Sequence, residues 1–171
     1  MKRFICIIVV LILIYSFSSC ANQTHAIKNP ITFYYRTETI SFETGASVIC
    51  AETREIIDAS ADTESIIAQY LNGPQSNGCT SPFPAGTVLE SYSIDNNKAL
   101  ITLSPHLAIL NGSDLMIACA CLTKTITDLT GVKSVQIRAV DSLLNNQESI
   151  TVTADDFYSI DESFDYISTP D

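Results

Sequence analysis

Two apolar-patterned segments flank the dipeptide Asn96-Asn97, and they constrain the fold more than any other part of the chain. Asparagine tolerates the positive φ angles of a two-residue turn, so the pattern predicts an antiparallel hairpin of residues 88–95 with 98–104. The register places Ile94 opposite Ala99, Tyr92 opposite Ile101 and Glu90 opposite Leu103. The other face pairs Ser93 with Leu100 and Ser91 with Thr102. Apolar partners collect mainly on one face, as a half-buried sheet requires.

Residues 62–72 have the period of an amphipathic helix. Asp62 can cap the first turn, and Gly73-Pro74 cannot continue the helix. The apolar stripe consists of Ile66, Ile67, Tyr70 and Leu71. The segment 73–87 that follows contains three glycines and three prolines, and this composition predicts a loop.

A second, longer helix is predicted over residues 113–130, where apolar residues recur at three- and four-residue steps. Asn111 or Ser113 can cap its start, and Gly131 can close its end. Four further segments are predicted as strands because they are rich in β-branched or alternating apolar residues: 31–37, 53–57, 132–140 and 149–153. This order predicts an α+β domain of two layers, with a mainly antiparallel sheet and two helices on one face.

The amino end has the features of an export signal. Lys2 and Arg3 precede a run of 12 apolar residues, and this run is shorter than the roughly 20 that a spanning helix needs. Phe17-Ser18-Ser19-Cys20 resembles a bacterial lipobox, although leucine is usual where Phe17 stands. We therefore expect residues 1–19 to be removed and Cys20 to carry the lipid. Cleavage after Ala21 and an uncleaved anchor are the alternatives.

The mature chain would consist of a tether over 20–30, a domain over 31–154 and an acidic tail over 155–171. The tail is interpreted as a disordered solubilising segment, with a docking strip for a basic partner as the alternative. Seven basic residues would remain against 19 acidic ones, a net charge of −12. Binding to nucleic acid needs the opposite charge, so that class is excluded. The covalent lipid is then the expected contact with the membrane.

Four cysteines lie in the expected domain: Cys50, Cys79, Cys119 and Cys121. An exported chain can pair cysteines as disulfides. Cys119 and Cys121 are two positions apart in the predicted helix, so they point about 200° apart and can neither pair nor share a metal. The pattern favours four reduced, partly buried thiols and leaves the other pairings open.

The domain contains one histidine, His106, and His25 lies in the tether. The sequence has no HExxH motif, paired CxxC motif, GxSxG elbow or phosphate-binding glycine loop. His106 is interpreted as a surface or helix-entry residue rather than part of a triad, and the many carboxylates as solvated groups rather than an acid–base pair. We therefore assign no catalytic, metal-binding or cofactor-binding residue, and expect a protein that is not an enzyme.

Several short segments resemble the GerMN domain of Gram-positive sporulation and spore germination lipoproteins. In chain order they are "ITFYYR" from 31, "AETREI" around Glu52 and Arg54, Gly73-Pro74, "PAGT" at 84–87, Leu103-Ser104, the long helix and "GVKSV" at 131–135. Together they cover residues 31–140, and their order and spacing are more specific than any one of them. The chain has room for one copy of the domain, whereas the family's namesake has two.

The resemblance implies an envelope protein without known catalysis, facing the extracytoplasmic side of the membrane. It also implies a fold similar to the ring-building domains of sporulation and secretion complexes. The expected partners are envelope or sporulation-complex proteins, with the membrane reached through the lipid anchor. A ligand-binding or hydrolytic lipoprotein acting on cell-wall material is the alternative. A cleft with convergent polar groups would favour that alternative, and a flat sheet face or exposed strand edge would favour assembly.

Overall fold

The computed structural model describes residues 29–38, 47–56 and 60–157. Its elements, in chain order, are β1 Pro30–Thr37, β2 Ile49–Glu55, α2 Thr63–Leu71, β3 Cys79–Thr80, β4 Leu89–Asp95, β5 Lys98–Leu103, the 3-10 helix η1 Pro105–Ile109, α3 Gly112–Thr130, β6 Ser134–Ala139, β7 Ile150–Thr153 and the 3-10 helix η2 Ala154–Phe157. Both predicted helices and the strands at 31–37, 132–140 and 149–153 are confirmed. The second strand was predicted at 53–57 but begins at Ile49.

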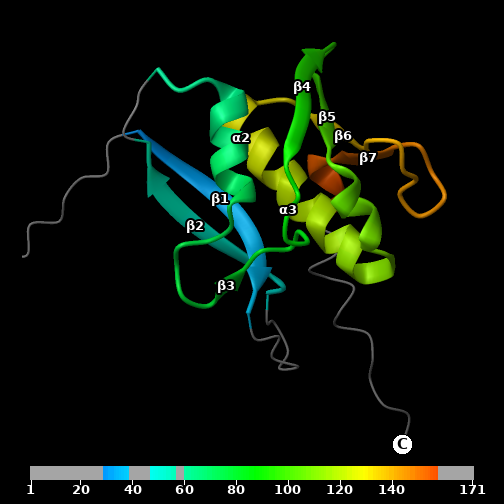
Figure 1. Cartoon of the computed structure of the whole chain (residues 1–171). Coiled ribbons are helices and arrows are strands. Elements are labelled where there is room, and N and C mark those ends of the chain that lie inside the picture. The colour runs from blue at the N-terminus through cyan, green and yellow to red at the C-terminus, as the bar shows by residue number, and fades with distance from the viewer. Residues whose placement is uncertain (1–28, 39–46, 57–59, 158–171) are drawn as a thin grey trace, which may run out of the picture.

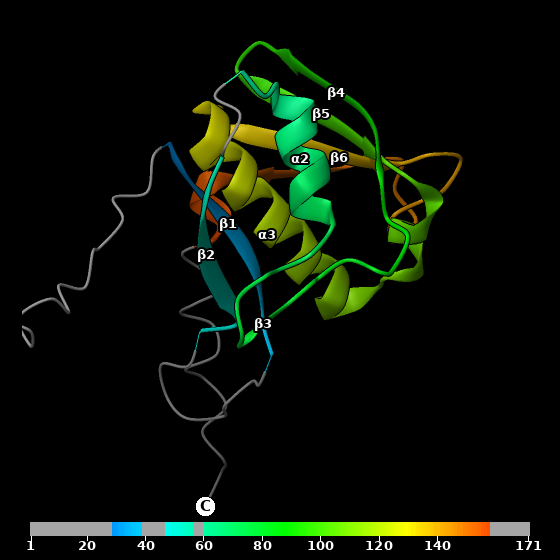
Figure 2. The same cartoon turned by 60° about the vertical axis from the view of Figure 1, so that its left-hand side comes forward.

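The strands form two sheets, with the orders β2-β1-β3 and β4-β5-β6-β7. The α+β class with two helices and mainly antiparallel strands is confirmed. The prediction of a single sheet is wrong, because β1 and β2 pair with each other and do not join the hairpin sheet. Both helices consequently lie between the two sheets (Figures 1 and 2). β5 and β6 are parallel, since α3 carries the chain back to the same end of the sheet.

The hairpin register is confirmed from Ser91–Thr102 to the turn, where Asn96 and Asn97 have φ angles of 48° and 63°. The prediction that Glu90 faces Leu103 is wrong, because a bulge between Leu89 and Ser91 places Leu89 there instead. A bulge inserts one extra residue in a strand and shifts the register beyond it. The alternation of side chains is regular before and after the bulge, so the sequence pattern does not reveal where the bulge lies.

The core forms where the helices meet the inner faces of the sheets. Ala99, Ile101 and Leu103 of β5 and Val135, Ile137 and Ala139 of β6 are buried, as their alternation predicts. Asp62 caps α2 by accepting a hydrogen bond from the Ser65 backbone N–H, at 2.8 Å. Asn111 is the first cap residue of α3 but its side chain makes no capping hydrogen bond, and Gly131 closes that helix at φ 75°.

β1 contacts both helices, and these contacts cover the part of its edge that β3 leaves open. The Tyr34 backbone N–H donates to Thr125 Oγ1 of α3 at 3.0 Å, and the Tyr34 carbonyl accepts from the Tyr70 hydroxyl of α2 at 2.7 Å. Phe33, Tyr35 and Tyr70 are fully buried, and their ring centroids lie 5.0–6.4 Å apart. Helix α2 is therefore held to the first sheet by an aromatic cluster.

A disulfide joins Cys50 of β2 to Cys79 of β3, with the two Cα atoms 5.7 Å apart. The prediction that all four cysteines are reduced is wrong for this pair. The two residues meet because β2 and β3 both pair with β1, and β3 is a two-residue strand inside the segment predicted as loop. Cys119 and Cys121 are free and buried, so their predicted inability to pair is confirmed.

Candidate functional site

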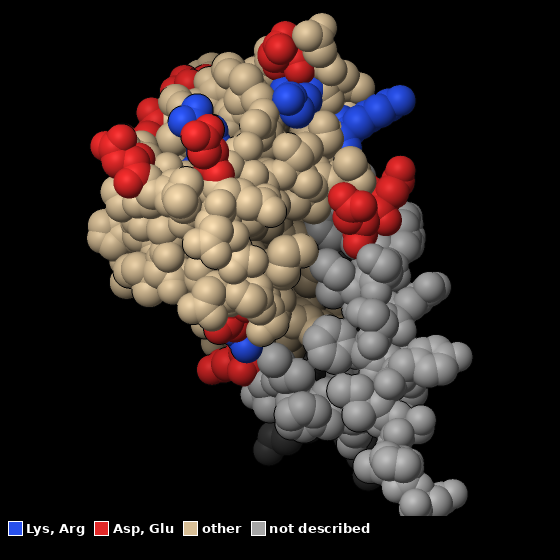
Figure 3. All heavy atoms as spheres, turned by 90° about the vertical axis from the view of Figure 1, so that its right-hand side faces the viewer, with Lys and Arg blue, Asp and Glu red and all other residues tan. Residues whose placement is uncertain are grey.

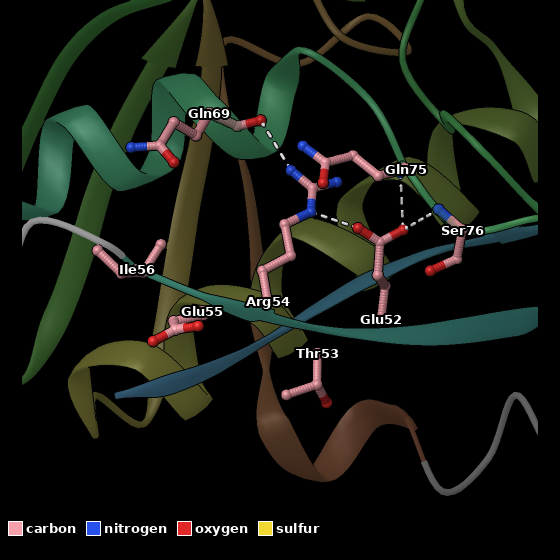
Figure 4. Close-up of a pocket in the computed structure, with 8 residues that line it drawn as sticks. All are labelled: Glu52, Thr53, Arg54, Glu55, Ile56, Gln69, Gln75 and Ser76. Atoms are coloured by element: carbon pink, nitrogen blue, oxygen red, sulfur yellow. Dashed lines mark hydrogen bonds and ion pairs between the residues drawn. The ribbon is translucent and has the colours of Figure 1, made fainter. Parts of the chain in front are cut away.

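A pocket of about 610 Å³ opens beside β2, between this strand and the end of α2. It is lined by Glu52, Thr53, Arg54, Glu55, Ile56, Gln69, Gln75 and Ser76 (Figure 4). Strand alternation sends Glu52 and Arg54 toward α2, and Thr53 projects from the opposite side of β2. The two charged side chains form an ion pair through Arg54 Nε and Glu52 Oε1. The pocket is therefore built around a charged pair that lies almost out of water.

The Glu52 carboxylate has hydrogen-bond donors on both of its oxygens. Oε1 accepts from Arg54, and Oε2 accepts from the backbone N–H groups of Gln75 at 2.8 Å and Ser76 at 2.7 Å. Burial by itself raises the pKa of Glu52, but these hydrogen bonds to the charged form outweigh it, so the pKa lies below its usual value of 4.5. Glu52 is consequently ionised at neutral pH and unsuited to donate a proton.

Arg54 connects β2 to β1 and to the end of α2. Its Nη2 donates to the Tyr35 hydroxyl at 2.9 Å and to the Gly73 carbonyl at 2.7 Å, and its Nη1 reaches the Gln69 carbonyl at 3.5 Å. The guanidinium carbon also lies 4.9 Å from the Phe33 ring centroid. These carbonyls belong to the last turn of α2 and the residues after it, where a helix leaves acceptors unsatisfied. The pair therefore acts as a brace for the end of α2.

The two charged side chains of this pocket have few hydrogen-bonding groups left for a ligand. Most donors and acceptors of Glu52 and Arg54 form hydrogen bonds with other groups of the protein. Within residues 29–38, 47–56 and 60–157 no group of three or more histidine, cysteine or carboxylate side chains could hold a metal ion. Sequence reasoning noticed Glu52 and Arg54 only as part of a short matching segment. Alternating charges inside a strand are the feature that could have revealed their structural role.

The structure places His106 on the surface in η1, next to Ser104, whose hydroxyl contacts the segment that enters β4. Its Nδ1 lies 3.2 Å from Ser104 Oγ, and the same hydroxyl accepts from the Val88 backbone N–H at 3.1 Å. Gly86 has φ +85°, and a Cβ there would lie 3.2 Å from His106 Nε2. Ser104 is 3% exposed, so this pair joins backbone segments inside the fold. Cys20, the predicted lipid site, lies outside the described residues.

The outer face of the four-stranded sheet is a second candidate site. Strand register aligns a row of four residues across it: Ser93, Leu100, Gln136 and Thr151. Ser93 and Thr151 are exposed, and Leu100 and Gln136 are half-buried. Both α2 and α3 lie on the other side of this sheet (Figures 1 and 2). The side of the molecule that carries this face has a broad area without charged side chains, with charges toward its margins (Figure 3).

No helix within the described residues is long and apolar enough to cross a membrane. Among curated proteins, none matches this chain. The tandem GerMN domains of the sporulation protein GerM from Bacillus subtilis match with a TM-score of 0.53 at 20% identity, over 71% of this chain and 44% of that one. The first GerMN domain of the same protein gives a TM-score of 0.48 at 18% identity, over 69% of this chain and 91% of that one. The match to the tandem domains shows that the fold is that of a GerMN domain.

The family model for Germane, described as sporulation and spore germination, matches residues 32–142. The chain belongs to this family. It spans less than half of the tandem structure, so the roles of the two-domain protein do not transfer directly. The match contains the Glu52–Arg54 brace, the hairpin and the long helix.

Proposed function

We propose that this chain is a lipid-anchored protein of the Gram-positive cell envelope whose domain binds another protein on the extracytoplasmic side, in sporulation or spore germination. The charged start, the short apolar run and the small residues before Cys20 support lipid attachment. The Cys50–Cys79 disulfide supports an exported location, because disulfides form and persist in oxidising compartments outside the cytoplasm. The family description supports a role in sporulation or germination.

The observation that carries the binding role is the outer face of the four-stranded sheet. Ser93, Leu100, Gln136 and Thr151 form a row of uncharged side chains on the sheet face turned away from α2 and α3, and the neighbouring Lys98 Nζ donates to Gln136 Oε1 at 3.1 Å. Interfaces between separately folded proteins have about this mixed polarity, and charged residues are depleted at their centres. The pocket beside β2 offers the ligand-binding alternative less support, because its ion pair is occupied by the protein itself.

Lipid attachment is tested by the Cys20→Ala substitution in the full chain. The variant should appear in the medium or remain as unprocessed precursor, while the parent enters the detergent phase. Unchanged detergent partitioning of the variant would contradict the anchor and favour an uncleaved membrane segment.

The binding role is tested by crosslinked pull-down from sporulating and growing cells. We expect Ser93→Lys to reduce partner capture, because it places a charge at the β4 end of the uncharged row. Thr53→Lys, at an exposed position on β2, is the matched control and should leave capture intact. His106→Ala should leave the cellular phenotype intact. A lost phenotype with His106→Ala in a folded protein, together with intact capture by Ser93→Lys, would replace this proposal with an enzymatic or ligand-binding one.

A further inference from the structure

The outer edge of β4 presents backbone hydrogen-bonding groups that no strand within the described residues uses. β4 is a terminal strand of its sheet, and it runs along the rim of the domain in the view of Figure 2. In a hairpin closed by a two-residue turn, hydrogen-bonded and non-hydrogen-bonded pairs alternate from the turn outward. Asp95–Lys98 and Ser93–Leu100 are hydrogen-bonded pairs in this register. Tyr92 and Ile94 therefore direct their N–H and C=O groups away from β5.

The edges of β1 and β7 are protected in ways that the β4 edge is not. The edge of β1 donates to Thr125 of α3, and β7 has only four residues, with the Thr153 N–H bound by Asp156 at 2.7 Å. β4 has seven residues and contains no proline or lysine, the residues that commonly blunt an exposed edge. Ile94 is 51% exposed, although its side chain lies on the inner face of the sheet. An open edge next to an exposed aliphatic side chain is the arrangement that strand addition uses.

We propose that the β4 edge binds an extended segment of a partner protein in which aliphatic and basic residues alternate. The inference rests on the proposed function and specifies where and how the partner binds. The partner strand would complete the backbone hydrogen bonds of Tyr92 and Ile94, and its aliphatic side chains would cover Ile94. Its basic side chains would face Glu90 and Asp95, the exposed carboxylates on this strand.

The charge of the β4 edge favours a basic partner segment over a second copy of the chain or the chain's own tail. A second copy, taken as residues 20–171, would bring a net charge of −12 against the same charge, and its β4 would add a second Glu90 and a second Asp95 at this edge. The chain's tail beyond Phe157 contains four acidic residues and no basic one. Like charges directly opposite across a strand pair are destabilising, and opposite charges are stabilising. A basic segment from another protein is therefore the occupant that the edge favours.

The direct test uses the full chain in detergent micelles and two hexapeptide probes, one alternating valine with lysine and one alternating valine with glutamate. The lysine probe should bind and slow amide hydrogen exchange at Tyr92 and Ile94, and the glutamate probe should not. Ile94→Pro removes an N–H that faces the open edge while leaving the hairpin ladder intact. It should weaken binding of the lysine probe by about tenfold, the equivalent of roughly one strand hydrogen bond.

Ile94→Ala is the matched control, because it removes the same side chain and keeps the N–H. The proposal holds if Ile94→Pro weakens binding clearly more than Ile94→Ala does, and if Glu90→Lys also weakens it. Equal effects of the two Ile94 variants, equal binding of both probes, or protection confined to other strands would overturn it.

A photoreactive residue introduced in cells at position 94 or position 100 separates the two proposals. Crosslinks from position 94 to another protein support the edge inference. Crosslinks from position 100 alone would overturn the edge inference and leave the proposed function standing. No crosslink from either position, with the chain anchored and folded, would overturn both.

Discussion

Replacement of Arg54 by methionine should destabilise the domain more than any surface change, because it isolates a buried carboxylate. Methionine keeps the aliphatic stem of the side chain but leaves Glu52, which is 4% exposed, without its ion-pair partner. Removal of one member of a buried pair costs about 3–5 kcal/mol. Glu52 would retain the backbone N–H groups of Gln75 and Ser76, so we expect the lower end, about 3 kcal/mol.

The pH dependence of this loss has a definite sign. In the parent the pKa of Glu52 lies below 4.5, so its contribution to stability is present above pH 4.5 and is lost as the pH falls through the folded-state pKa. In Arg54→Met the lowering interaction with Arg54 is gone and burial remains, which raises the pKa of Glu52. Because the pKa of Glu52 is then higher in the variant than in the parent, the variant loses less stability than the parent as the pH falls. Its deficit should therefore shrink between about pH 7 and about pH 4.

The assay is urea denaturation of the parent and Arg54→Met at both pH values, followed by circular dichroism. Glu55→Gln is the matched control, since it removes an exposed carboxylate from the same strand and should change the free energy of unfolding by less than about 0.5 kcal/mol. The claim that the Glu52–Arg54 pair stabilises the end of α2 would be refuted by either of two results. One is a decrease in the free energy of unfolding below about 1 kcal/mol for Arg54→Met, and the other is a decrease that grows as the pH falls.

Three further predictions concern the cysteines and the hairpin turn. Burial raises the pKa of the Cys119 and Cys121 thiols to about 12, so neither should react with a thiol reagent near about pH 8 until urea unfolds the chain; rapid labelling of the folded chain would contradict this. Replacement of Cys50 and Cys79 together by alanine should lower the free energy of unfolding by about 3 kcal/mol, and a reductant should then have no further effect. Asn97→Ala should cost about 1 kcal/mol because φ is 63° there, whereas Asn97→Gly should be close to neutral; equal losses in denaturation would show that the turn is not responsible.

Much of the fold was predictable because it depends on local periodicity. The hairpin register near the turn, the cap at Asp62, the closing glycine at 131 and the buried face of β6 all follow from residues close together in the chain. The sequence pattern of each element shows which of its faces is apolar, and that face is the one that packs into the core. Neither helix nor hairpin needed information from a distant segment to be recognised.

Parts of the candidate sites were not predictable, because they depend on which distant segments meet. The Arg54 guanidinium gains its role only when β1 and α2 bring the Tyr35 hydroxyl and the Gly73 carbonyl to it. The open β4 edge exists because the strands divide into two sheets and leave β4 as a terminal strand. A sequence pattern records which face of a strand is apolar, but it does not record which strand lies beside it.

The sequence by itself therefore determined both helices, the hairpin, the buried faces of these elements, the acidic charge and the family resemblance. Only the tertiary structure decided that Cys50 and Cys79 form a disulfide across 29 residues, that β5 and β6 run parallel, and that a bulge shifts the hairpin at Leu89. The physical reason is that propensity and periodicity act over a few residues. Strand pairing and disulfide formation instead depend on contacts made when the whole core assembles around α2 and α3.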